Sequence, residues 1–246
     1  MIISLQNISK SFGANNVLKN ISIAIDKKEC VGIIGPNGAG KSTLFKIISG
    51  SLFQDGGSII FNDANIDKLS IEKRSRLGIS QSFQSNSLFN EMTVKENIMV
   101  ACSQSFKVGW ELFKSLDKRT NIITKSYEIA EEVGLTEYLD FRSDNLSYGL
   151  QRQLEVGLAI ANNPSLLLLD EPTAGMSNEE TKNIVKMVKK LSTYYTTIIV
   201  EHDMDVIYSL AKKIYVLDSG DLIFDGTPNE VKNSKLVQER YIGIKQ

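Results

Sequence analysis

Residues 35–43 read Gly35-Pro36-Asn37-Gly38-Ala39-Gly40-Lys41-Ser42-Thr43 and set the expectations for the whole 246-residue chain. They fit the pattern G-x-x-x-x-G-K-[ST], after an apolar run and before a segment with helical spacing. Glycines allow backbone N–H groups to close around phosphate oxygens, and the start of the helix adds positive potential. The stretch therefore predicts a phosphate-binding loop, with Lys41 at the β- and γ-phosphates and the Ser42 hydroxyl on Mg²⁺. A glycine-rich turn that only resembles the pattern is the alternative, and the strand and helix on either side disfavour it.

The composition is that of one sizeable soluble domain, with 42% apolar residues, 23% charged residues and a formal net charge of −1. This charge balance gives no broad basic surface, so nucleic acid is not expected as a partner. No apolar run approaches the roughly 18 residues of a membrane span, and the N-terminus lacks the features of a signal peptide. Cys30 and Cys102 are far apart and are expected to be small buried hydrophobes, in a reducing compartment.

Apolar and alternating runs predict the strands, and segments with helical spacing predict the helices between them. The expected strands cover residues 2–5, 21–25, 31–34, 58–61, 166–169, 196–200, 214–217 and 222–224, with turns at Asn15-Asn16, Gly56-Gly57 and Gly220. The expected helices cover residues 43–49, 154–161 and 179–191. This alternation predicts an α/β fold with a mostly parallel sheet and crossover helices.

The character of the sequence changes between about residues 86 and 145, where Glu, Lys and apolar residues recur at helical spacing. Helices are expected at residues 93–101 and 126–133, with Thr93 and Ser126 as N-caps and Gly134 ending the second helix. We interpret this stretch as a helical lobe inserted into the α/β core.

Two further strand ends carry polar side chains of functional interest. Asp170 and Glu171 follow the apolar strand at residues 166–169, and His202 follows the strand at 196–200. Ligands of open parallel sheets bind at the carboxyl ends of the strands, so these residues should meet the phosphate loop. Asp170 suits the Mg²⁺ shell, Glu171 suits a general base for an attacking water, and His202 suits a contact to the γ-phosphate or that water. A lone histidine is otherwise most often structural.

Two positions are weaker candidates. Gln84 lies where the core gives way to the helical lobe, and its amide could ligate Mg²⁺ or water; Gln81 is a nearby rival. Phe12 precedes Gly13 in an early loop and could stack on a base, and a core phenylalanine is the equal alternative.

Taken together, these segments resemble the ATP-binding subunit of an ABC transporter over nearly the whole chain. The matching positions are Phe12 (A-loop), residues 35–43 (Walker A), Gln84 (Q-loop), 146–151 (signature), 166–171 (Walker B), 174–178 (D-loop) and His202 (H-loop). Residues 87–97, 201–204 and the ending 226–243 look like those of branched-chain amino acid importer ATPases. Ala174-Gly175-Met176 leans slightly towards urea and amide importers, and the lipopolysaccharide-export ATPase shares the tyrosine-containing signature Leu146-Ser147-Tyr148-Gly149.

The resemblance implies a P-loop ABC nucleotide-binding domain in which residues 1–85 and 154–246 form the core with an antiparallel β-subdomain. Residues 86–153 would form the helical subdomain. It also implies ATP and Mg²⁺, with Ser147 and Gly149 contacting the γ-phosphate of ATP held by a second subunit, identical or related. The remaining implied partners are transmembrane permeases and, indirectly, a solute-binding protein, with the chain placed in the cytoplasm on the inner face of the membrane.

Two departures from the family pattern stand out: Leu150 replaces the usual glutamine of the signature, and Ser177 replaces the Asp or Asn that often ends the D-loop. Because of these departures, a regulatory subunit that binds ATP without hydrolysing it stays an alternative. A soluble ABC ATPase of translation or DNA maintenance and a nucleotide kinase are also possible. The first usually has two nucleotide domains, and the second would not need the signature.

Overall fold

A six-stranded sheet crosses the centre of the part of the chain that the computed structural model describes, residues 1–82, 88–105 and 116–242. Its order is β10-β9-β3-β8-β7-β6, and every neighbouring pair except β9 and β10 is parallel. The strands are β3 (Cys30–Ile34), β6 (Ile79–Gln81), β7 (Leu166–Asp170), β8 (Thr196–Val200), β9 (Lys213–Asp218) and β10 (Asp221–Gly226). The mostly parallel α/β core predicted from the sequence is confirmed.

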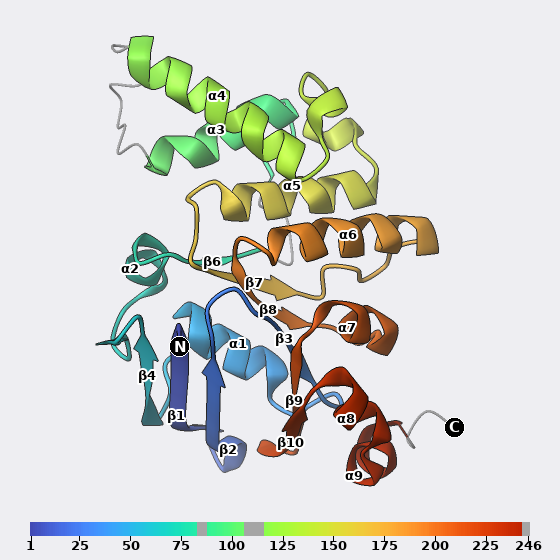
Figure 1. The fold of residues 1–246 in the computed structure, drawn as a ribbon. Coiled ribbons are helices and arrows are strands. Elements are labelled where there is room, and N and C mark those ends of the chain that lie inside the picture. The colour runs from blue at the N-terminus through green and yellow to red at the C-terminus, as the bar shows by residue number, and fades with distance from the viewer. Residues whose placement is uncertain (83–87, 106–115, 243–246) are drawn as a thin grey trace.

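A second, antiparallel sheet lies beside this core, at the lower left of Figure 1. It has the order β2-β1-β4-β5 and consists of β1 (Ile3–Phe12), β2 (Asn15–Ile25), β4 (Gly56–Phe61) and β5 (Ala64–Asn65). The predicted turn at Asn15-Asn16 is wrong, because both residues pair with β1 and the turn is made by Gly13 and Ala14. The turn predicted at Gly56-Gly57 is also wrong, because both residues belong to β4; a Cβ on Gly57 would lie 2.4 Å from the Gln6 carbonyl oxygen of β1.

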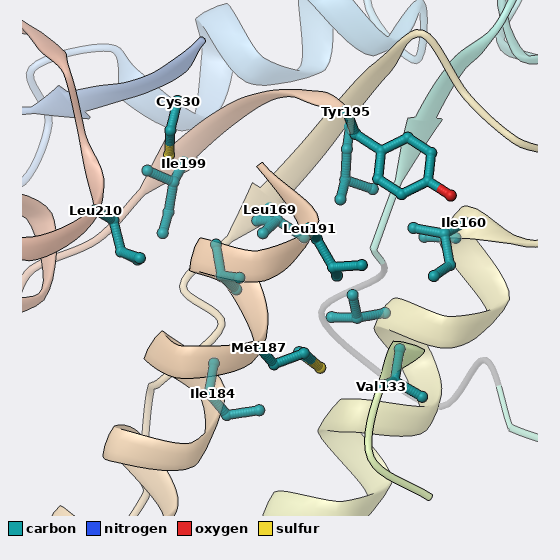
Figure 2. Close-up of a cluster of buried hydrophobic side chains, with 14 of the residues drawn as sticks. Cys30, Val133, Ile160, Leu169, Ile184, Met187, Leu191, Tyr195, Ile199 and Leu210 are labelled. Carbon is teal, nitrogen blue, oxygen red and sulfur yellow. The ribbon is translucent and has the colours of Figure 1, made fainter. Parts of the chain in front are cut away.

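Two hydrophobic cores lie on opposite faces of the parallel sheet, because successive side chains of a strand point to opposite faces. Leu167, Leu169 and Ile199 belong to one core, and Leu166, Leu168 and Ile198 belong to the other. The first core is covered by helices and includes the Cys30 thiol; Figure 2 shows its side chains meeting between strands and helices. The second core includes the buried face of α1 (Lys41–Ser49) and joins the parallel sheet to the antiparallel one.

The helical lobe stands above the sheet in Figure 1 and contains α3 (Val94–Ser105) and α4 (Leu116–Glu132). Thr93 caps α3 as predicted, since its hydroxyl accepts from the Glu96 N–H while the Glu96 carboxylate accepts from the Thr93 N–H. Ser126 is not a cap. It lies inside α4, where its hydroxyl donates to the Ile123 carbonyl at 2.7 Å.

The other helices either lie between strands in the chain or follow the last strand. The first kind are α2 (Ile71–Arg76), α5 (Tyr148–Ile160), α6 (Asn178–Leu191) and α7 (Met204–Leu210), and the second kind are α8 (Pro228–Asn233) and α9 (Lys235–Val237), with single turns at Thr136–Tyr138, Ser143–Asn145 and Gln238–Ile242. The helix predicted at 154–161 begins six residues earlier, at Tyr148, and ends at Ile160. Among the described residues, no helix is both long and apolar enough to cross a membrane.

Candidate functional site

The loop at residues 35–43 leaves the end of β3 and enters α1, as the sequence predicts. Glycine is required where the loop turns. Gly40, the N-cap of α1, has φ +100°, and a Cβ there would lie 2.6 Å from Leu18 Cδ2. At Gly38, φ is +82° and a Cβ would meet nothing within 4 Å, so the loop is open on that side. The loop is thus tightly packed at Gly40 and open at Gly38, and it lies at a helix N-terminus, which suits an anion.

Lys41 lies at the base of this loop with its side chain buried. Its Nζ donates to the carbonyl oxygens of Gly35 at 2.7 Å and Pro36 at 3.1 Å. Burial lowers the pKa of Lys41, while the carboxylates of Glu171 and Asp170 act in the opposite direction. The ammonium group therefore lies within electrostatic range of the acidic end of β7.

Asp170 ends β7 and lies within electrostatic range of the phosphate loop. Its pKa is raised, chiefly by burial and then by the neighbouring Glu171, against the opposing charges of Arg152, Lys46 and Lys41. Within the described part of the chain, its Oδ1 atom is buried and has no hydrogen-bond partner. An unpaired carboxylate oxygen near a loop that also carries the exposed Ser42 fits a hard cation such as Mg²⁺, which takes oxygen ligands.

Glu171 and His202 meet directly. The β7–β8 register pairs Asp170 with Val200, so the two residues follow neighbouring strand ends. The Glu171 N–H donates to the Val200 carbonyl at 2.8 Å, and the His202 Nε2 lies 2.9 Å from Glu171 Oε1. Glu171 has φ +47°, a backbone conformation that is costly for a non-glycine residue and that is typical of functional sites.

Glu201 was not among the residues predicted for the site. Its carboxylate links the segment after β7 to the segment after β8. It is 3% exposed, and its Oε1 accepts from the N–H and the hydroxyl of Thr173 at 2.7 and 2.6 Å. Its Oε2 accepts from the His202 N–H at 3.2 Å. Burial raises the pKa of Glu201, and the Thr173 hydrogen bonds partly offset that effect. An acidic residue directly before the lone histidine, at the end of an apolar strand, was the available signal.

Arg152 of α5 was also missed as a site residue. Its guanidinium donates to Glu155 Oε2 at 2.6 Å and to the Glu171 carbonyl oxygen at 3.3 Å, and both side chains of the Arg152–Glu155 pair are buried. Arg152 therefore connects α5 to the backbone of Glu171.

The signature turn forms the N-terminus of α5. Ser147 is the N-cap, and its hydroxyl oxygen accepts from the Leu150 N–H at 3.4 Å. The Gly149 N–H donates to Glu180 Oε1 at 3.2 Å. Leu150 packs its side chain against the hydrophobic core, and Ser177 caps α6 through a reciprocal pair of hydrogen bonds with Glu180. Within the described residues, no hydrogen bond joins this turn to the loop at 35–43.

The two weaker candidates have different outcomes. Phe12 ends β1 and is 52% exposed, with Lys10 Nζ 5.5 Å from its ring centroid, so it is not a core residue. Gln84 lies outside the described residues. Its rival Gln81 is the last residue of β6 and pairs with Leu168 of β7.

Comparisons with known proteins point to the same kind of site, a nucleotide-binding one. The sequence profile of the ABC transporter family matches residues 18–174. The high-affinity branched-chain amino acid transport ATP-binding protein LivG of Escherichia coli is 33% identical over 98% of both chains. The lipopolysaccharide export system ATP-binding protein LptB of Haemophilus influenzae is 31% identical over 98% of this chain and 97% of that one.

Solved structures show the same fold. The ADP conformation of MJ1267, an ATP-binding cassette of an ABC transporter, is 30% identical over 98% of both chains, with a TM-score of 0.87. A dimeric structure of the bacterial ABC transporter cassette MJ0796 is 25% identical over 92% of this chain and 99% of that one, with a TM-score of 0.77. The chain therefore belongs to the ABC transporter family and is one of its ATPase cassettes.

Proposed function

We propose that this chain hydrolyses ATP as one of two ATP-binding subunits that energise an importer of branched-chain amino acids or a related small polar solute. The observation that carries the proposal is the pairing of Glu171 with His202 at 2.9 Å, at neighbouring strand ends whose acidic groups act on Lys41 of the phosphate loop. A carboxylate and an imidazole held together beside a phosphate site suit activation of a water molecule.

Each part of the site has a role in this proposal. The backbone N–H groups of residues 35–43 cradle the phosphates of ATP, and Lys41 exchanges its carbonyl partners for the β- and γ-phosphate oxygens. Ser42, Asp170 and Gln84 would hold Mg²⁺, which neutralises phosphate charge when bound. The exposed ring of Phe12 stacks on the adenine.

Glu171 accepts the proton of the attacking water, and His202 holds Glu171 and the γ-phosphate in register. The positive φ of Glu171 turns its carboxylate off the line of β7, and the Arg152 contact to its carbonyl keeps that turn in place. The buried hydrogen bonds between Thr173 and Glu201 make the arrangement rigid, because they are made in the low-dielectric interior of the protein.

The signature turn acts on a second subunit. Ser147 and Gly149 lie at the N-terminus of α5, which favours an anion, and they are not bonded to the phosphate loop of their own chain within the described residues. The dimeric cassette of similar fold supports pairing of two such chains, so that each turn covers ATP held by the other subunit.

The solute class and the location rest on the relatives. LivG acts in branched-chain amino acid transport, and its similarity spans nearly all of both chains. We infer that permease subunits supply the membrane pore, that a solute-binding protein delivers the solute, and that the chain works on the inner face of the membrane. Lipopolysaccharide export is the second candidate, because LptB is 31% identical over a similar length.

Reconstitution tests the transport role. The chain is purified with the membrane proteins that accompany it and placed in vesicles with ATP. Accumulation of leucine, isoleucine or valine is expected. Accumulation of urea alone would keep the ATPase role and replace the solute. Purification without any membrane protein, together with normal ATPase activity, would contradict the transport role.

A further inference from the structure

The carboxylate of Glu180 lies between two helix N-termini. Its Oε2 accepts from the N–H and the hydroxyl of Ser177, the N-cap of α6, at 3.0 and 2.8 Å. Its Oε1 accepts from the Gly149 N–H in the first turn of α5 at 3.2 Å. One side chain of α6, the helix that follows the D-loop, is thereby bound to the signature turn of the same subunit.

This contact uses a donor that a phosphate would need. In the first turn of α5, the Leu150 N–H is bonded to the Ser147 hydroxyl and the Gly149 N–H is bonded to Glu180. A helix N-terminus favours one anion through its free N–H groups. Glu180 already supplies that anion, and its hydrogen bonds from Ser177 and Gly149 hold its pKa below the usual range, so it stays ionised at neutral pH.

The packing around the contact is close on one side and open on the other. A Cβ on Gly149 would lie 2.9 Å from Glu180 Oε1 and 3.0 Å from its Cγ, so only glycine allows this approach. A cavity of about 250 Å³ opens beside it, and Ser147, Gly149, Ser177 and Glu180 are among the residues that line it. The carboxylate therefore has open space beside it on the side away from the close contact with Gly149.

We propose that Glu180 acts as a latch. It holds the Gly149 N–H as long as the signature turn covers no ATP, and it releases that N–H when the γ-phosphate of the partner's ATP arrives. The inference rests on the proposed role of Gly149 in covering that ATP. The latch opposes closure of the dimer by competing for the donor and by repelling the phosphate. It also links α6 to the signature turn, so that a movement of either one on closure of the dimer changes the contact made by the other.

The test measures ATP-driven dimerisation by sedimentation velocity in the Glu171→Gln variant, which should trap ATP-bound dimers. Adding Glu180→Gln removes the negative charge but keeps an oxygen that can accept from Ser177. The ATP concentration for half-maximal dimerisation is expected to fall at least about threefold, the scale of one charge at a helix N-terminus. Damage to folding would weaken the dimer, so a stronger dimer cannot result from misfolding.

Glu230 offers a matched control. It accepts from the N–H and the hydroxyl of Thr227 at 2.7 and 2.8 Å, the same capping arrangement at the start of α8, without a contact to α5 among the described residues. Glu230→Gln should leave dimerisation unchanged. Glu180→Ala, which removes the acceptor as well, should strengthen the dimer in the same direction as Glu180→Gln.

The outcomes separate the two proposals. Dimers of the Glu171→Gln protein that are unaffected or weakened by both Glu180 variants would overturn the latch and leave the proposed function standing. Absence of ATP-dependent dimers in the Glu171→Gln protein itself would overturn the proposed role of Gly149, and the latch with it.

Discussion

The His202 Nε2 atom lies 2.9 Å from Oε1 of Glu171, although the two residues are 31 positions apart in the chain. The contact exists because β7 and β8 are parallel neighbours with Asp170 opposite Val200, so both residues stand just beyond the same edge of the sheet. Glu201 then fixes the His202 backbone to Thr173. The two strands and a buried carboxylate together set the geometry of the pair.

Replacing His202 by alanine should slow ATP hydrolysis without abolishing ATP binding. The imidazole contacts Glu171 and is 46% exposed on its side chain, so its loss costs orientation rather than folding stability. Misplacing reacting groups by about 1 Å can cost on the order of 100-fold in rate, and a fall of that size in kcat is expected. Steady-state kinetics with a parallel binding titration checks this. An unchanged kcat would remove His202 from the mechanism.

Replacing Phe12 by alanine should weaken ATP binding roughly tenfold, within the range of base stacking on an aromatic ring. Because Phe12 is 52% exposed, the free energy of unfolding should change by less than about 0.5 kcal/mol. Phe53, which is 47% exposed, provides the control: Phe53→Ala should leave the Kd for ATP unchanged. Equal effects of the two variants would show that Phe12 has no special contact with the nucleotide.

Much of the site could be predicted because its residues follow short apolar strands. The strand at 196–200 has the predicted bounds, and the one at 166–169 extends by a single residue to Asp170. Since parallel strands end at one edge of the sheet, the sequence alone was enough to place the acidic pair and the histidine together.

The parts that could not be predicted depend on contacts between distant segments. Arg152 contacts the Glu171 carbonyl only because α5 packs over the end of β7, and Glu180 contacts Gly149 only because α5 and α6 lie side by side. Local signals were also incomplete. Ser126 resembles an N-cap, but α4 already begins at Leu116, so the Ser126 hydroxyl bonds within the helix.

Breaking the buried ion pair of Arg152 should destabilise the protein strongly. Arg152→Met leaves the Glu155 carboxylate buried without its 2.6 Å partner, and the free energy of unfolding should fall by about 3–5 kcal/mol. The double variant Arg152→Met/Glu155→Met should recover a large part of that loss, because neither charge of the pair is then present in the interior.

An exposed pair of the same length is the control for Arg152. Arg142 and Asp144 are also 2.6 Å apart, with 50% and 38% of their side chains exposed, so Arg142→Met should lower the free energy of unfolding far less than Arg152→Met. Urea unfolding curves of the three variants and the unaltered protein measure these differences. Similar losses for Arg142→Met and Arg152→Met would contradict the importance of burial.

The two cysteine thiols should resist alkylation in the native protein at pH 8. Burial raises the pKa of both Cys30 and Cys102 from 9.0 to about 11, and a neutral thiol is a poor nucleophile. Because the folded-state values lie above the unfolded value, their contribution to stability is complete below pH 9 and is lost as the pH rises through about 11. Thiol titration should find no fast-reacting group in the native protein and both groups in denaturant. A fast-reacting native thiol would contradict the burial.

Glu171→Gln tests the central claim most directly. The amide keeps the size of the side chain but cannot accept a proton, so ATP binding should persist while single-turnover hydrolysis slows by about 100-fold or more. The same protein should accumulate as ATP-bound dimers. Near-normal hydrolysis by the Glu171→Gln protein would contradict the assignment of Glu171 as the catalytic carboxylate.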